Sequence, residues 1–389
     1  MSIRVAALAA LLLTITSPAR AADAERPPEE ITPLLLRVPE APIPFNGSDG
    51  RTHLVYELWI TNFSSADARV EQVEVRGGDT TLATLDGAAV AARLQPAGRR
   101  DSTDLLESGA TGLLFVHVTL PAGAAVPAEL THVVQARIKA APPPMQQMTL
   151  AGGAVQVNRR PVVVIGPPLR GDNFIAADSC CDATRHTRAA LPVNGAVHLA
   201  QRYAVDWEQL DGERRIYKGP RETLASYTIF GKEALAVADA TVSSVLDGEK
   251  EQVPGTFPSD ISLAQADGNS VVLDLGSGNF ALYAHLQPGS LRVKAGDRVT
   301  RGQVLGLVGN TGNSVAPHLH FHVMDGPSPL ASNGLPYEID RFTVTGHAPG
   351  TAAFDQAEEH GTPLAITPAS PPVSASKALP LDQSIVSFP

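Results

Sequence analysis

Three histidines alternate with apolar residues in the run "HLHFHV", at His318, His320 and His322. Successive side chains of a β-strand point to opposite faces, so the three imidazoles should share one face while Leu319 and Phe321 anchor the other in a core. A His-x-His pair on such a strand can aim two nitrogens at one metal ion, and zinc binds them at about 2.0–2.1 Å. The spacing therefore predicts a metal site in a groove beside a strand.

Two further residues could join this site. His285 ends the strand-like run "LYAHL", just before a Pro-Gly turn, and Asp206 lies inside the apolar run "RYAVDW". A carboxylate inside an apolar strand is costly unless it is compensated, so Asp206 is expected to meet a cation. His53, His117 and His132 instead sit singly in strand-like runs, and we expect them to be structural because metal ligands normally cluster.

The region around these residues resembles a known family. Tyr-Ala-His-Leu, Gly-Asp-x-Val-x-x-Gly-Gln and Asn-Thr-Gly before Pro-His-Leu-His-Phe follow one another between residues 283 and 321. They occur in the order found in lysostaphin/LytM-type zinc metallopeptidases, and residues 180–340 are similar to that family. The resemblance implies a zinc metalloendopeptidase that binds one Zn²⁺ per chain and hydrolyses peptide bonds of peptidoglycan cross-links.

The resemblance also implies roles for individual residues. His320 and Asp206 correspond to zinc ligands, whereas His285 and His318 correspond to catalytic histidines that face the substrate. The third ligand of the family is usually a histidine four residues before the aspartate, and Arg202 stands there in this chain. The pattern is therefore broken at one of its three ligands.

Two histidines could replace the missing ligand. His198 precedes Asp206 on one strand, and the two would lie some 26 Å apart at about 3.3 Å per residue if the strand is extended. Asn194-Gly195 is a strong hairpin signal. Folding about it pairs residues whose numbers sum to about 389, which brings His186 opposite Tyr203 and close to Asp206. We therefore predict His186 as the third ligand.

His322 stands where the family often has an acidic residue. Because it shares a face with His320, it could hydrogen-bond the site from outside the metal ligands, or it could be a solvated strand residue. Both interpretations are open from the sequence.

Two other classes of function are also open. A catalytically inactive relative could bind the wall or activate another murein hydrolase, and the broken ligand pattern favours this alternative. A biotinyl- or lipoyl-type carrier is the second, because "VKAGDRVTRGQVLG" resembles the hairpin of those domains, but Lys294 lacks the setting of a modifiable lysine. Bound zinc would separate the hydrolase from both.

The rest of the chain predicts a mostly β protein. Strand-like runs separated by Gly, Ser, Asp and Pro indicate an N-terminal antiparallel β-sandwich, Ig-like, over residues 22–165. A LytM-like antiparallel β-sheet metallopeptidase domain is expected over residues 166–346, with "GPPLRGDNF" as its linker. Residues 347–389 are expected to be a Pro/Ala/Ser-rich, mostly irregular tail, from which "LPLDQSIVSFP" could dock as a strand.

Residues 1–21 have the order of a cleavable signal peptide: a basic end, a short apolar run, and Ala19-Arg20-Ala21. The predicted location is therefore periplasmic or secreted, in a Gram-negative bacterium, without a stable membrane anchor. A net charge of -10 and a pI near 5.5 do not favour a nucleic-acid partner. The expected partners are a peptidoglycan peptide and, through the sandwich, another protein.

The chain has two cysteines, and they are neighbours, Cys180 and Cys181. Adjacent Cα atoms lie about 3.8 Å apart across a trans peptide, which is shorter than the usual disulfide span. We expect a strained or reduced structural pair.

Overall fold

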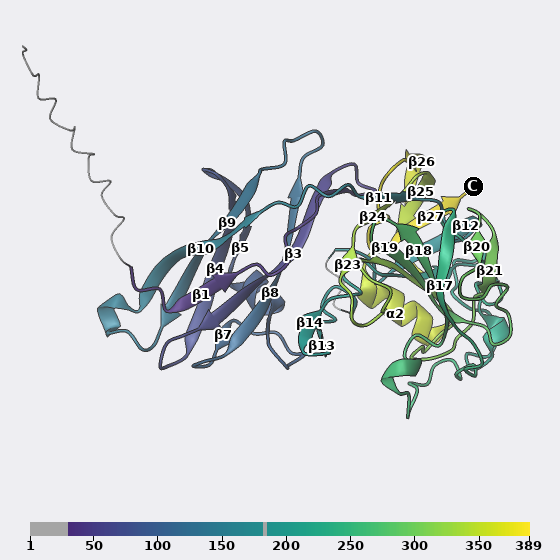
Figure 1. Ribbon diagram of the computed structural model, residues 1–389, viewed down its shortest axis with the longest axis horizontal. Helices are drawn as coiled ribbons and strands as arrows, with labels where there is room; N and C mark the ends of the chain where they lie inside the picture. The colour runs from purple at the N-terminus through teal and green to yellow at the C-terminus, as the bar shows by residue number, and fades with distance from the viewer. Residues whose placement is uncertain (1–29, 182–184) are drawn as a thin grey trace, which may run out of the picture. The chain divides into compact units, whose positions relative to one another are not determined.

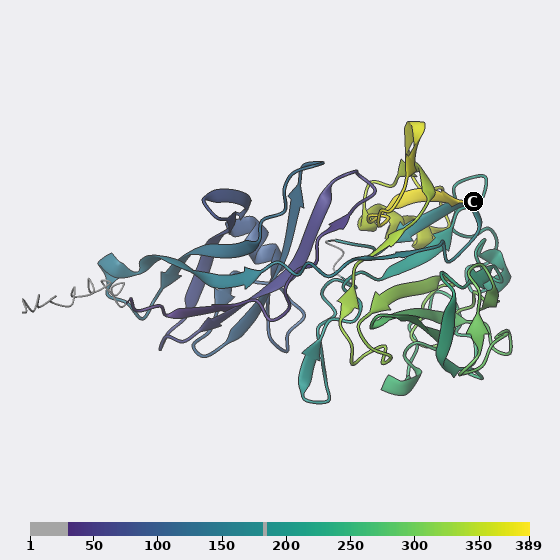
Figure 2. The same cartoon turned by 45° about the horizontal axis from the view of Figure 1, so that its top comes forward.

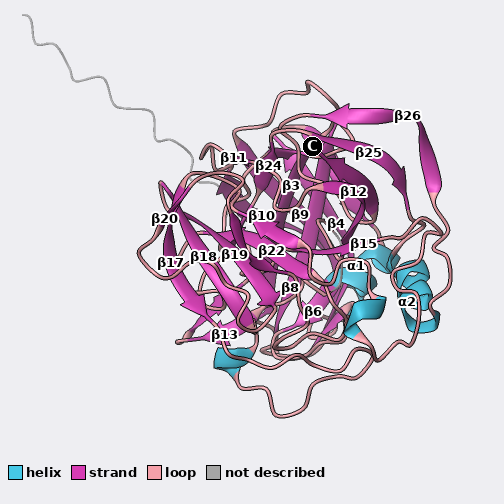
Figure 3. Cartoon of the chain, turned by 90° about the vertical axis from the view of Figure 1, so that its right-hand side faces the viewer, coloured by secondary structure: helices cyan, strands magenta, loops and turns pink. Residues whose placement is uncertain are grey.

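The computed structural model describes residues 30–181 and 185–389, so the predicted signal peptide lies outside the described residues. The fold is mostly β, as predicted: an N-terminal antiparallel β-sandwich is followed by a large antiparallel sheet (Figure 1). The helical segments are few and short (Figure 3). Neither α-helix within residues 30–181 and 185–389 is long and apolar enough to cross a membrane.

The sandwich consists of two sheets of five strands each. The first contains β1 (Leu34–Arg37), β3 (Thr52–Asn62), β8 (Thr111–Leu120) and β6 (Leu94–Pro96) in this order, with β2 (Phe45–Asn46) paired to β3. The second contains β10 (Gln147–Gln156), β9 (Glu129–Ile138), β4 (Ala68–Gly77) and β5 (Thr80–Leu85), with β7 (Leu105–Leu106) paired to β4. The short helix α1 (Gly87–Arg93) connects β5 to β6.

Alternation of side chains explains this core. Leu54, Leu58 and Ile60 of β3 point to one face and are fully buried against Val70 and Val73 of β4 in one hydrophobic cluster. Burying such side chains stabilises a fold by about 1.5–3 kcal/mol each relative to leaving them exposed. The period-2 pattern of β3 therefore defines its buried face, while a register shift between Val70 and Gln72 brings both Val70 and Val73 of β4 into the same core.

The large sheet has eleven strands. Their order is β20 (Arg298–Val299), β17 (Ala240–Leu246), β18 (Asn269–Gly276), β19 (Asn279–Leu286), β22 (Leu319–Met324), β15 (Val205–Gln209), β12 (Gly171–Ala177), β27 (Ser384–Phe388), β25 (Phe342–His347) and β26 (Thr367–Ala375), with β23 (Gly334–Leu335) on β22. Three small pairs complete the fold: β11 (Val163–Ile165) with β24 (Tyr337–Ile339), β13 (Leu191–Val193) with β14 (Ala196–His198), and β16 (Glu233–Leu235) with β21 (Val304–Leu307).

Two boundaries differ from expectation. The run containing β11 was expected in the sandwich, but β11 pairs in parallel with β24. The predicted linker 166–174 already includes the start of β12, and its Leu169 and Phe174 are buried in the core of the large sheet. Local pattern could not show this, because the partners of both strands lie far along the chain.

The C-terminal segment is also more ordered than expected. Residues 347–389 were expected to be mostly irregular, but they contain helix α2 (Thr351–His360) and strands β26 and β27. The expected docking of the last run as a strand agrees with β27, which pairs with both β12 and β25. Strands β26 and β27, yellow in Figure 2, are therefore part of the large sheet.

Cys180 and Cys181 form a disulfide, and the peptide bond between them is cis. The expectation of a strained or reduced pair assumed a trans peptide. Ser179, the preceding residue, donates from its backbone N–H to Asp382 and from its hydroxyl to the carbonyl of Pro380, so this turn is tied to the C-terminal segment.

A buried ion pair connects the sandwich to the large-sheet region. The Arg202 guanidinium donates to both carboxylate oxygens of Glu57 in β3, at 2.9 and 2.6 Å, and the two side chains are 6% and 2% exposed. Bidentate geometry of this kind satisfies both charges away from water. The Arg202 guanidinium is therefore occupied by its ion pair with Glu57.

Replacing either partner alone should leave a buried charge without compensation. We expect Glu57→Ala to lower the free energy of unfolding by about 3–5 kcal/mol, and Glu57→Leu with Arg202→Leu to recover most of that loss. The measurement is urea unfolding followed by tryptophan fluorescence. As a matched control, Arg99→Met removes the exposed Arg99–Glu107 pair and should change stability by less than about 1 kcal/mol. Equal losses in the single and double variants would contradict this expectation.

We expect the sandwich core to lose stability in acid because of the buried side chain of His132. Its Nε2 accepts from the Tyr56 hydroxyl at 2.8 Å and its Nδ1–H donates to the carbonyl of Gly153 at 3.0 Å, which requires the neutral ring. Burial lowers the pKa of His132 to about 4, whereas the unfolded chain takes up this proton near 6.5. Stability should therefore fall by up to about 3 kcal/mol as the pH falls from about 6.5 to 4.

Glutamine can donate and accept similar hydrogen bonds without titrating. Urea unfolding of the parent and of His132→Gln across this pH range should show a shallower loss of stability in the variant. An unchanged slope would exclude His132 as the source of acid sensitivity.

Candidate metal centre and cleft

Three adjacent strands bring the predicted site residues together. Asp206 of β15 lies directly opposite His320 of β22, and His320 lies opposite Ala284 of β19. His285 follows Ala284 and would point to the other face by strand alternation, but its backbone is left-handed, with φ of 63°, and its ring lies 5.8 Å from the ring of His320. The site is therefore built across the middle of the large sheet.

The alternation predicted for β22 holds. Leu319, Phe321 and Val323 are buried in the hydrophobic core on one face of the sheet, and the histidines occupy the other. A shift of register by one residue would exchange the two faces. Apolar packing of the odd-numbered positions thus fixes where the imidazoles point.

His186, Asp206 and His320 form a group that could hold a metal ion. Their ligand atoms lie within 4.8 Å of one another. His320 Nδ1 is 2.8 Å from Asp206 Oδ1, and His186 Nε2 is 3.4 Å from Asp206 Oδ2. Two imidazole nitrogens and one carboxylate oxygen are a donor set of catalytic zinc sites.

The outer nitrogens of both imidazoles already have partners, as in metal-binding histidines generally. His186 Nδ1–H donates to the carbonyl of Asp178 at 2.8 Å, so Nε2 is the nitrogen that faces Asp206 and that a metal ion would bind in place of a proton. In this structure His320 Nδ1 donates to Asp206 Oδ1 at 2.8 Å, and its Nε2 lies 3.0 Å from Nδ1 of His322. With an ion bound, His320 would ligate through Nδ1 and donate from Nε2 to His322. The residues present therefore fit zinc.

The structure places His186, and not His198, beside Asp206. The hairpin has the predicted register over its short length, with Leu191 opposite His198, but the strand pairing ends there and does not extend to His186. Among the described residues, His198 belongs to no group of potential metal ligands. Arg202, at the broken position of the pattern, points instead to Glu57.

His285 and His318 lie side by side, with ring centroids 4.7 Å apart. His285 Nδ1–H donates to the carbonyl of Thr311 at 2.7 Å, and His318 Nδ1–H donates to the carbonyl of Ala316 at 2.8 Å. Each ring thereby keeps its Nε2 available, and His318 Nε2 is 3.4 Å from Asp206 Oδ1.

The Asn-Thr-Gly motif supports this arrangement. The Thr311 hydroxyl accepts from the N–H of Asn269 and donates to the carbonyl of Leu286, beside His285. Gly312 has φ of 76°, and a Cβ there would lie 2.3 Å from the backbone nitrogen of Gly268. Only glycine permits this close approach, which explains the third residue of the motif.

Electrostatics separate the protonation states of the site. Burial acts to raise the pKa of Asp206, but His186 and His318 outweigh it and hold that pKa well below its usual range. Burial alone would lower the pKa of His186, but the Asp206 carboxylate raises it to about 9. The carboxylate likewise raises the pKa of His318 against the effect of burial. Burial, with His318 and His320, lowers the pKa of His285 well below its usual value.

His322 is fully buried, which excludes the solvated alternative, and it contacts His320. Burial, with His320 next, lowers the pKa of His322 well below its usual value. A neutral His322 can accept from His320 and so fix its tautomer.

The site opens into a cleft of about 570 Å³. Sequence reasoning missed four carboxyl groups in its wall: Glu208 of β15, Glu358 of α2, Asp178 and Asp267. Burial raises the pKa of Glu208 well above its usual value, and Glu358 adds to the effect. Alternation along β15 could have placed Glu208 on the face of Asp206, but no local signal could bring α2 to this cleft.

Residues 227–332 match Peptidase family M23. This range contains His285, His318 and His320, but not His186 or Asp206. Peptidoglycan DD-endopeptidase ShyA of Vibrio cholerae is 44% identical over 57 residues, which are 15% of this chain and 13% of ShyA. DD-carboxypeptidase/endopeptidase Mpg of Neisseria meningitidis is 40% identical over 91 residues, which are 23% of this chain and 20% of Mpg. The chain thus spans a fifth or less of the length of these relatives.

A similar solved structure is the catalytic domain of lysostaphin from Staphylococcus simulans, with 22% sequence identity and a TM-score of 0.22; the match covers 42% of this chain and 86% of that one. Another is the M23 protein EnpA of Enterococcus faecalis, with 18% identity and a TM-score of 0.26, covering 44% and 92%.

The geometry predicts which variants retain metal. The purified chain should bind about one zinc ion; His186→Ala should lose it because one of three ligands is removed, and His198→Ala should keep it. Metal content by elemental analysis, with circular dichroism to verify folding, is the measurement. Retention by His186→Ala together with loss in His198→Ala would reverse the ligand assignment.

Proposed function

We propose that this chain, whose residues 227–332 belong to Peptidase family M23, is a zinc-dependent endopeptidase that hydrolyses peptide bonds of peptidoglycan cross-links. The observation that carries the proposal is the convergence of His186, Asp206 and His320 beside His285 and His318 in one cleft. The similarity to the peptidoglycan DD-endopeptidase ShyA and the DD-carboxypeptidase/endopeptidase Mpg supports the reaction class, and the similarity to ShyA supports the substrate.

His186, Asp206 and His320 would hold the zinc ion. When bound there, zinc polarises a carbonyl oxygen and lowers the pKa of a bound water toward about 7. The chain supplies the negative charge through Asp206, and it orients both imidazoles through Asp178 and His322.

His285 and His318 would move the protons. Because Nδ1 of His285 is held by the Thr311 carbonyl and its pKa is low, its Nε2 is a free base that can accept a proton from the attacking water. The Asp206 carboxylate raises the pKa of His318 against the effect of burial, which favours the protonated ring; that ring can stabilise developing negative charge and then protonate the leaving amine. Two neighbouring histidines with opposite pKa shifts thus suit the base and acid roles.

The substrate and location follow from the same proposal. A cleft of about 570 Å³ beside the histidines is large enough for a short peptide. Peptidoglycan lies outside the cytoplasm, so the enzyme would act in the periplasm or after secretion, which the predicted signal peptide favours. The sandwich would position the catalytic region or bind a protein partner.

The first test is digestion of purified muropeptides. The parent should convert cross-linked dimers to monomers, lose this activity with a chelator, and regain it with zinc. His285→Ala and His318→Ala should each lower turnover by about 10²- to 10⁴-fold, since a positioned acid or base contributes that much. Liquid chromatography with mass spectrometry measures the products, and metal analysis of both variants should still give about one zinc.

The outcomes separate the proposal from the inactive alternative. Binding of zinc and wall material without any cleavage would support a wall-binding or activator protein and overturn the endopeptidase. Cleavage that persists without metal would overturn the zinc mechanism.

A further inference from the structure

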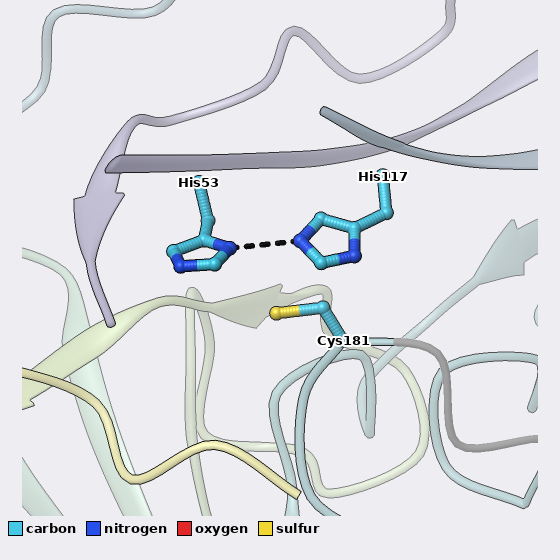
Figure 4. Close-up of side chains that lie close together, drawn as sticks. All are labelled: His53, His117 and Cys181. Carbon is cyan, nitrogen blue, oxygen red and sulfur yellow. Dashed lines mark hydrogen bonds between the residues drawn. The ribbon is translucent and has the colours of Figure 1, made fainter. Parts of the chain in front are cut away.

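A second group of potential metal ligands lies outside the cleft. His53 of β3, His117 of β8 and Cys181 have ligand atoms within 4.8 Å of one another. Figure 4 shows the two rings facing each other edge to edge, with the sulfur of Cys181 on the same side of both. The cleft residues do not include these three, and the endopeptidase mechanism does not use them.

The two nitrogens are poised for one ion. His53 Nδ1 and His117 Nε2 are 2.8 Å apart, so in this structure they share one hydrogen. Two nitrogens bound to tetrahedral zinc at about 2.0–2.1 Å would lie about 3.3 Å apart. If the two nitrogens moved apart by roughly half an ångström, a metal ion could bind between them in place of the shared hydrogen.

The surroundings of the rings suit ligation. His53 Nε2 lies 3.0 Å from Asp49 Oδ1 and donates to this carboxylate, which directs the Nδ1 lone pair toward His117. A carboxylate on the outer nitrogen is the common support of a zinc-bound histidine. The ring of His53 also stacks on Phe45, with centroids 5.5 Å apart. Burial, with His53 next, lowers the pKa of His117 to about 4, so this ring is a neutral ligand at neutral pH.

The oxidation state of the Cys181 sulfur decides whether it can act as a ligand. Cys181 is bonded to Cys180 in this structure, and a disulfide sulfur is not the thiolate that zinc prefers. A dithiol reductant supplies two electrons and two protons, breaks the S–S bond, and is itself oxidised to a disulfide. The Cys181 thiol then releases its proton when an ion binds.

We propose that His53, His117 and Cys181 form a second zinc site, which exists only when the Cys180–Cys181 disulfide is reduced. Two imidazoles and one thiolate are a zinc donor set, with the fourth position left to water. In an oxidising compartment the disulfide withholds the Cys181 thiolate and the site cannot bind zinc. After reduction the thiolate becomes available, so zinc occupancy of this site reports the redox state of the two cysteines.

Two isosteric variants test this proposal without relying on reduction of a buried bond. Cys180→Ser leaves Cys181 permanently free, whereas Cys181→Ser removes the ligand and leaves Cys180 free. The metal-depleted full chain would be titrated anaerobically with Co²⁺, whose thiolate complexes absorb in the near ultraviolet. We expect Cys180→Ser to bind about two equivalents with the thiolate band, and the oxidised parent and Cys181→Ser to bind about one without it.

Two further variants assign the ions. Adding His117→Asn to Cys180→Ser should remove the band and one equivalent. Adding His186→Ala to Cys180→Ser should remove one equivalent but keep the band, because the cleft ligands contain no sulfur; failure of the endopeptidase site is thus distinguishable. Absence of the band from Cys180→Ser, an equal band in Cys181→Ser, or a band unaffected by His117→Asn would overturn the proposal.

Discussion

The Asp206 carboxylate, held inside the large sheet among imidazoles, is the constraint on which the rest of the structure depends. Withdrawing an ionised carboxylate from water costs several kcal/mol unless partners compensate it. His186, His318 and His320 surround its two oxygens at 2.8 to 3.4 Å. The charge of Asp206 is compensated only where the segments that carry these histidines meet. The strand order and register that bring them together therefore also build the site.

Backbone carbonyls do much of the orienting. Those of Asp178, Thr311 and Ala316 each accept from Nδ1 of a different histidine, and each belongs to a turn or loop beside the sheet. A carbonyl only accepts, so it keeps the hydrogen on Nδ1 and leaves Nε2 as the nitrogen that faces the cleft. The loops around the cleft are therefore positioning devices as much as connections. The turn 178–181 extends this logic, because it supports His186 at one end and presents Cys181 at the other.

Strand alternation made much of this site predictable. The faces of β22, the location of Asp206 in a strand and the hairpin at Asn194-Gly195 all depend on neighbours within a few residues. The sequence also supported His186 over His198, and the structure places His186 beside Asp206.

Long-range pairing set the limit of prediction. No local sequence pattern indicates that Arg202 pairs with Glu57. Nor does one indicate that His53 of β3 and His117 of β8, which were expected to be isolated, share a hydrogen. The same reason hid the sheet partners of β11, β12 and the C-terminal segment, and with them the approach of Glu358 to the cleft.

The place of β27 in the sheet has a consequence for biosynthesis. Residues 384–388 lie between β12 and β25, and β12 is itself the neighbour of β15, which carries Asp206. One edge of β12 has no partner until a segment some two hundred positions later has emerged from the ribosome. Contacts this distant in sequence form slowly, because a large loop must close before they give any return in free energy. The sheet around Asp206 is therefore completed late, after translation of nearly all of these residues, which delays assembly of the cleft during synthesis.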